Sequence, residues 1–71
     1  MARYYFDFHD HEIIADTVGK ELPNLSAAQH EAVRILGAFV ADDHHAPMSI
    51  VVREGTERVL TVRITVEVSA P

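Results

Sequence analysis

Four histidines stand in two pairs that could bind a metal ion. His9 and His11 flank Asp10, and His44 and His45 are adjacent in a later polar segment. Imidazole nitrogens are common ligands of zinc and nickel. A site would need both pairs to converge in space, and the spacing matches no established metal motif. The pattern therefore leaves two interpretations open: a small metal- or ligand-binding protein, or, as the spacing favours, solvated loop histidines.

Carboxylates near the N-terminus could perform acid–base chemistry. Asp7, Asp10, Glu12 and Asp16 lie within ten residues, and paired carboxylates serve as general acid and base in many enzymes. A small sheet with short loops offers no cleft that would shift their pKa values, so we expect exposed turn and edge carboxylates. The chain also has no phosphate loop, dinucleotide fingerprint or nucleophile motif. We expect no enzyme and no cofactor.

Aromatic and basic residues could stack and hold single-stranded RNA. Tyr5 would share a sheet face with Arg3, Arg53 and Arg63, which resembles the arrangement that RNA-binding sheets use. The chain has a formal net charge of −5, however, and acidic domains repel phosphate backbones. RNA binding is therefore a further alternative that the charge disfavours.

The composition is that of one small globular domain. The 71 residues predict a single domain over 1–71, with 48% hydrophobic residues and no cysteine. A chain of this length has a marginal core, and subunit association commonly stabilises such domains. No stretch has the pattern of a signal peptide or the length of a membrane span. We expect a cytoplasmic protein that does not bind membranes.

Hydrophobic periodicity predicts the elements that would position these residues. Residues 3–9 alternate as a strand, 13–15 form a brief second strand, 25–42 follow the helical period, and 48–53 and 59–68 form two further strands. The order β-β-α-β-β predicts an α+β fold in which one helix packs on one face of a four-stranded, mostly antiparallel sheet.

Local signals add detail to this fold. Gly19 and Gly55 are predicted at turns, with Gly19 in the region of positive φ. Either Asn24 or Ser26 could cap the helix N-terminus. The core would place Phe6 and Phe8 of the first strand near Phe39 or Leu36 of the helix.

The helix has more apolar surface than one small sheet needs. A second stripe, made of Val33, Gly37, Val40 and Ala41, lies beside the core stripe, and exposed apolar surface of this kind marks contact sites. The long final strand would also present a backbone edge that must pair with the first strand or with another chain. The leading hypothesis is a non-enzymatic interaction module, either homodimeric or bound to a protein partner.

Two short motifs resemble a known family. Residues 3–7 are RYYFD, and residues 16–23 are DTVGKELP, followed by an alanine-rich helix and an alternating strand. This order resembles a family of short alphaproteobacterial proteins that is known as a domain of unknown function. The resemblance implies a compact α+β domain in the bacterial cytoplasm. It implies no activity and no catalytic residues.

Overall fold

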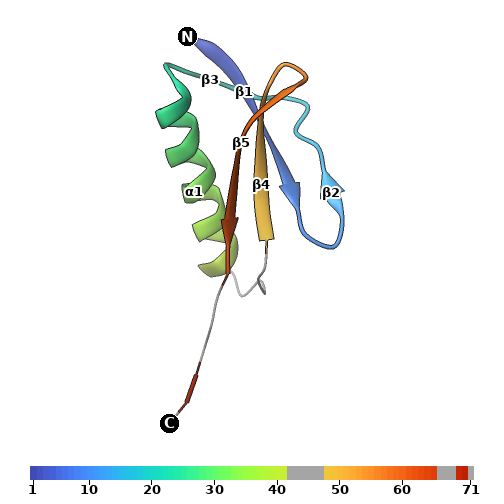
Figure 1. The fold of residues 1–71 in the computed structure, drawn as a ribbon, viewed down its shortest axis with the longest axis vertical. Coiled ribbons are helices and arrows are strands. Elements are labelled where there is room, and N and C mark those ends of the chain that lie inside the picture. The colour runs from blue at the N-terminus through green and yellow to red at the C-terminus, as the bar shows by residue number, and fades with distance from the viewer. Residues whose placement is uncertain (42–47, 66–68, 71) are drawn as a thin grey trace.

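A computed structural model describes residues 1–41, 48–65 and 69–70 of the chain. The elements, in chain order, are strands β1 (Ala2–His9), β2 (Ile13–Ile14) and β3 (Lys20–Leu22), helix α1 (Leu25–Ala41), and strands β4 (Met48–Glu54) and β5 (Glu57–Ile64). The predicted α+β class is confirmed, because α1 packs on one face of an antiparallel sheet (Figure 1). In the part of the chain that the model covers, no helix is long and apolar enough to cross a membrane.

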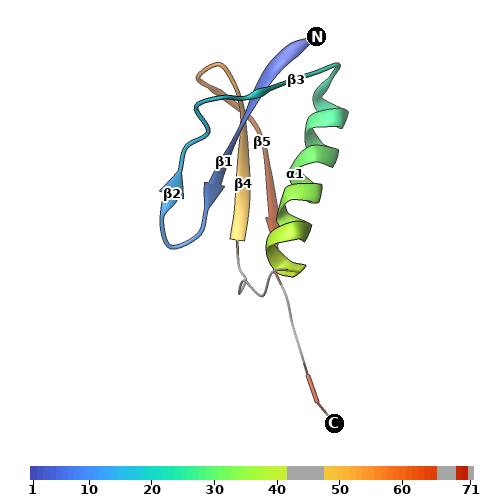
Figure 2. The same ribbon diagram turned by 180° about the vertical axis from the view of Figure 1, so that it is seen from behind.

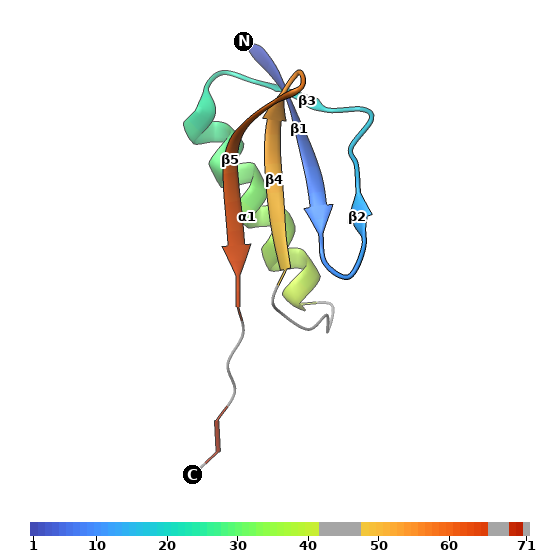
Figure 3. The same ribbon diagram turned by 45° about the vertical axis from the view of Figure 1, so that its right-hand side comes forward.

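The sheet is built around β1 and β4. Its strand order is β2–β1–β4–β5, and β3 pairs with the beginning of β1 on the same side as β2. Figure 3 shows β5 at one margin of the sheet and the β1–β2 hairpin at the other. The predicted sharing of a buried face between the last two strands is confirmed, since Ile50 pairs with Val62 and Val52 with Leu60.

The sheet has one strand more than the sequence predicted. β3 pairs over Ala2–Leu22, Arg3–Glu21 and Tyr4–Lys20, in a segment for which the sequence predicted no strand. Periodicity fails here because three residues are too few to show alternation. The extra strand matters because it anchors the turn before it against β1.

Hydrogen bonds to Asn24 mark the N-terminus of helix α1. The Ala27 backbone N–H donates to Asn24 Oδ1 at 2.9 Å, and the Ala28 N–H donates to the Asn24 carbonyl. Asn24 is therefore the N-cap, which decides between the two residues that the sequence left open. The helix extends to Ala41, close to the predicted end at residue 42.

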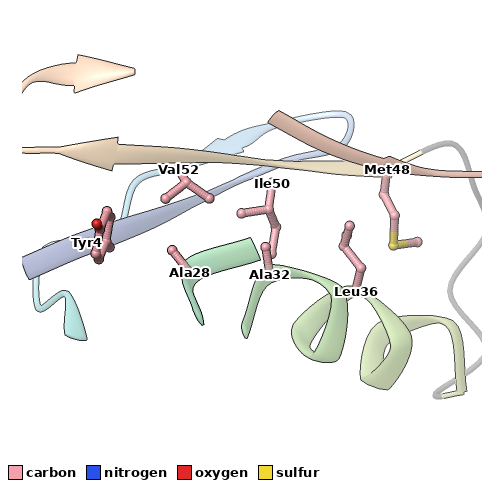
Figure 4. Close-up of a cluster of buried hydrophobic side chains, with 7 residues drawn as sticks. All are labelled: Tyr4, Ala28, Ala32, Leu36, Met48, Ile50 and Val52. Carbon is pink, nitrogen blue, oxygen red and sulfur yellow. The ribbon is translucent and has the colours of Figure 1, made fainter. Parts of the chain in front are cut away.

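The core lies between α1 and the sheet face above it. Figure 4 shows the side chains of the two layers meeting, with Ala28, Ala32 and Leu36 facing the strands. The fully or almost fully buried cluster comprises Tyr4, Ala28, Ala32, Leu36, Met48, Ile50 and Val52. The two alanines allow the helix backbone to approach the sheet closely, since they add little bulk to the contact.

Aromatic packing closes the core beside the helix C-terminus. The rings of Phe8 and Phe39 stack with centroids 4.5 Å apart, which confirms the expected contact between the first strand and the helix. Phe6 is half-buried against the same cluster. Figure 2 shows the resulting arrangement from behind: α1 runs along the β5 side of the sheet, and β2 lies at the opposite margin.

Candidate functional site

The sheet face that points away from α1, called here the far face, carries the polar residues of β1 and β4. Tyr5 pairs with Arg53, and Asp7 pairs with Val51, so these side chains lie side by side across the two central strands. Both Asp7 and Val51 are buried, with exposed fractions of 8% and 5%. A buried carboxylate needs ionic or hydrogen-bonding partners, because burial without them is costly.

Arg53 is the main partner of Asp7. Its Nε donates to Asp7 Oδ2, and its second amino nitrogen donates to Asp7 Oδ1 at 3.1 Å, which makes a bidentate pair. The same guanidinium donates to the carbonyls of Gly55 and Asp16. It also lies 4.9 Å from the centroid of the Tyr5 ring. One arginine thus joins β1, the β4–β5 turn and the segment before β3.

Asp16 completes this network from the connection between β2 and β3. Its Oδ2 accepts the Phe6 backbone N–H at 3.1 Å, and its Oδ1 accepts the N–H groups of Val18 and Gly19 at 2.9 and 3.1 Å. Its own N–H donates to Asp7 Oδ1 at 2.9 Å. Phe6 lies in β1 between the residues that pair with β3 and those that pair with β2. The Asp16 carboxylate therefore accepts the hydrogen bond that the carbonyl of a neighbouring strand would otherwise accept from Phe6. The same carboxylate also stabilises the turn that ends at Gly19.

Gly19 fits this turn for two independent reasons. Its φ is +73°, a region that residues with side chains rarely adopt, and this confirms the prediction from the sequence. A Cβ on Gly19 would lie 2.9 Å from Cε1 of Tyr5 and 3.0 Å from Cγ of Arg3. The aspartate and glycine of the motif at residues 16–23 are thus explained by packing against the far face.

The network holds both carboxylates in their ionised form. The Arg53 hydrogen bonds lower the pKa of Asp7 and outweigh its burial. Burial raises the pKa of Asp16, but the three backbone N–H donors outweigh this effect and the net pKa is lowered. An acid with a lowered pKa and filled acceptor sites is a poor proton donor at neutral pH. The expectation of exposed carboxylates was wrong for Asp7, because hydrogen-bonded charge can be buried. Asp16 is a turn carboxylate, as predicted, but it is half-buried.

The predicted RNA surface is already occupied by these contacts. Arg53 lies against the Tyr5 ring and is neutralised by Asp7. Arg3 donates to the Val18 carbonyl at 2.8 Å and lies 3.7 Å from Glu21. Sequence reasoning placed Tyr5 and Arg53 together correctly, but it did not identify that this group serves the fold.

The predicted metal ligands are not brought together among the described residues. β1 ends at His9, and His11 lies in the following turn with its side chain 97% exposed and 3.8 Å from Asp10. His44 and His45 lie outside the described residues. Within the described ranges, no group of three or more histidine or carboxylate side chains could hold a metal ion.

The second helix stripe is divided by the structure. Val33 is 51% exposed, and Gly37 and Ala41 are exposed. Val40 instead is half-buried against the core cluster. A Cβ added at Gly37 would meet no atom within 4 Å, so none of the described residues packs closely on that part of the helix.

Two open grooves adjoin Phe39 on the other flank of the helix. One has a volume of about 550 Å³ and is lined by Arg34, Ile35, Ala38, Phe39 and Ala41. The other, of about 320 Å³, is lined by Phe8, Asp10, His11, Glu12, Ile14 and Phe39. Neither lining includes a nucleophile with an adjacent base, so neither groove has the groups of a catalytic centre.

These features define a small α+β domain whose most elaborate polar cluster stabilises the fold. The model of the family described as Domain of unknown function (DUF6894) matches residues 3–65, and the chain belongs to that family. The matched span contains Asp7, Asp16, Gly19 and Arg53. No curated protein and no solved structure matches the chain.

Proposed function

We propose that this domain is a non-enzymatic interaction module that binds another polypeptide through one side of the molecule. That side, called here the β5 flank, consists of the free edge of β5, the half-buried β5 residues Leu60, Val62 and Ile64, and Val33 and Val40 of α1. The proposal is carried by one observation: among the described residues β5 is an edge strand, and beside it the helix exposes an apolar side chain.

The position of Val33 follows from helix geometry. Glu31, one residue before the buried Ala32, accepts a hydrogen bond from Lys20 of β3, and β3 pairs with β1. Successive helical residues are rotated by about 100°, so the residue after Ala32 lies on the opposite flank. Val33 therefore faces the side of the sheet where β5 lies, next to the half-buried row on that strand.

The edge of β5 has unused hydrogen-bonding capacity. Among the described residues, β5 pairs only with β4. Its outward N–H and C=O groups form a row to which a further strand can add. The apolar side chains on the helix side of that row would be covered by the same contact, which supports binding to a polypeptide rather than to a small molecule.

The remaining features support a module without catalysis. Asp7 and Asp16 hold the fold together, and the described histidines do not converge, so the described residues offer no site that supports acid–base or metal chemistry. The resemblance to short alphaproteobacterial proteins and the absence of cysteine support a place in the reducing bacterial cytoplasm.

A charge placed on the β5 flank tests the proposal. We expect Val33→Glu to weaken self-association or partner binding at least tenfold in light scattering or calorimetry, because it places an unpaired carboxylate in an apolar contact. His30→Glu is the matched control, since His30 is exposed on the outer side of the same helix. Far-UV circular dichroism should be unchanged in both. A wild-type chain that remains monomeric at millimolar concentration and retains no partner from its host would refute the proposal.

A further inference from the structure

We infer that the polypeptide bound at the β5 flank is a second copy of this chain, and that the two β5 strands pair antiparallel about a two-fold axis. The inference rests on the proposed function and names its partner. The result would be one continuous sheet across both copies, with the two helices on the same face.

The two margins of the sheet differ in whether other segments of the chain cover them. The outer side of β1 is covered by β2 and β3, and the Asp16 carboxylate accepts the Phe6 N–H in the interval between them. The outer side of β5 has no such cover in the described residues. Its pairing with β4 is regular from Leu60 to Ile64, with a single register shift opposite Val52 and Arg53. Edge strands that stay monomeric are commonly interrupted by bulges or charges; β5 has its extra residue at Val59, before the regular stretch, and Arg63 is the one charged residue within that stretch.

A strand of this kind is complementary to itself. In an antiparallel pair related by a two-fold axis, the outward N–H groups of each copy donate to the outward C=O groups of the other copy. The two-fold axis makes this exchange reciprocal. No new chemistry is needed from the partner. The row formed by Leu60, Val62 and Ile64 would meet the same row of the second copy, and Val33 would face the equivalent residue across the axis.

The size of the flank reaches the threshold for a specific dimer interface. The eight residues of β5 and the seventeen of α1 both extend about 26 Å at 3.3 and 1.5 Å per residue. A helix layer on a sheet gives a side about 20 Å thick, so each copy presents about 500 Å². Two copies would bury about 1,000 Å², the lower limit for a specific interface.

The opposite margin is the competing surface. Ile13 and Ile14 of β2 are 70% and 59% exposed, and they are the largest apolar side chains along that margin. The strand has only two residues, however, which gives a partner strand too few backbone groups to hold a register. We therefore place the axis at β5, and the experiment below includes β2 as its alternative.

The chain contains no cysteine, so one introduced cysteine carries one spin label. Thr61 is exposed on the far face of β5, and Ile13 is exposed on β2. With strands about 4.8 Å apart, pairing through β5 puts Thr61 labels within about 20 Å of each other and Ile13 labels more than about 30 Å apart. Thr61→Cys and Ile13→Cys are each spin-labelled, and the distance between the labels of the two copies is measured by pulsed electron–electron double resonance. Arg63→Cys provides a second position on β5, and circular dichroism verifies the fold of each variant.

Each outcome is decisive. Short distances at Thr61 or Arg63 with long ones at Ile13, lost on dilution below the dimer's dissociation constant, support the inference. Short distances at Ile13, or long distances at all three positions in a dimer, overturn it; the effect of Val33→Glu on binding of a different protein then decides whether the β5 flank has the proposed function. A chain that binds a different protein but never itself also overturns the inference alone, whereas a chain that binds nothing overturns both.

Discussion

Replacing Asp16 tests whether one carboxylate completes the sheet. Asp16→Ala removes the acceptor for the Phe6 N–H and for the two N–H groups of the turn that ends at Gly19. Hydrogen bonds to charged groups contribute about 1.5–3 kcal/mol when shielded from water and less when exposed. Because the turn bonds are the more exposed ones, we expect a loss of about 3 kcal/mol. A domain of this length has only about 4–11 kcal/mol of stability, so the loss is a large part of the total.

Asp16→Asn separates the two roles of this side chain. The asparagine oxygen can still accept the turn N–H groups, but its NH₂ group would then face the Phe6 N–H, which leaves two donors opposed. We expect an intermediate loss of about 2 kcal/mol. Urea unfolding followed by circular dichroism measures both variants, and each kcal/mol corresponds to about 4–8 °C in melting temperature for a domain of this size.

Asp10→Ala is the control for these variants. Asp10 lies in the turn after β1, and its side chain is 3.8 Å from the fully exposed imidazole of His11. Its replacement should change stability by less than about 0.5 kcal/mol. If Asp16→Ala and Asp10→Ala unfold at the same urea concentration, the carboxylate does not complete the sheet and the reasoning is wrong.

Two further predictions use the same unfolding measurement. Gly19→Ala should destabilise the domain by about 1–3 kcal/mol, because φ is positive and the new Cβ meets Tyr5, whereas Gly37→Ala should stabilise it by about 0.5–1 kcal/mol, because it sits in a helix with free space around it. Equal effects of the two would contradict the structure. Hydrogen bonds from Arg34 and Lys20 lower the pKa of Glu31 to about 2. This stabilisation is complete above the ordinary pKa near 4.5 and is lost as the pH falls toward 2; Glu31→Gln should therefore flatten the fall in stability between pH 5 and 2.

The helix and the main strands were predictable because their cause is local. The spacing of Ala28, Ala32 and Leu36 creates an apolar side only in a helix, and the alternation of Leu60, Val62 and Ile64 creates one only in a strand. Once both apolar sides exist, packing them together is the way to remove them from water, so the α+β class follows from the sequence. The stack of Phe8 on Phe39 is a direct consequence of that layering.

The polar network could not be predicted in this way. Asp7 and Arg53 are 46 residues apart, and Asp16 donates to Asp7 across nine. Nothing in the spacing of these residues distinguishes a buried acid from an exposed one. The motif at residues 16–23 marked the segment as unusual, and the structure gives the reason: a carboxylate replaces a strand carbonyl, and a glycine makes room for Tyr5.

The sequence by itself determined the helix, four of the five described strands and the acidic charge, since each depends on residue type and short spacing. Only the tertiary structure decided which charges are buried together and which strand remains at the margin. Those outcomes depend on strand order: β4 lies between β1 and β5, which brings Arg53 beside Asp7 and, among the described residues, leaves β5 with one side unpaired. Strand order is set by the summed packing of the whole chain, and no local pattern encodes it.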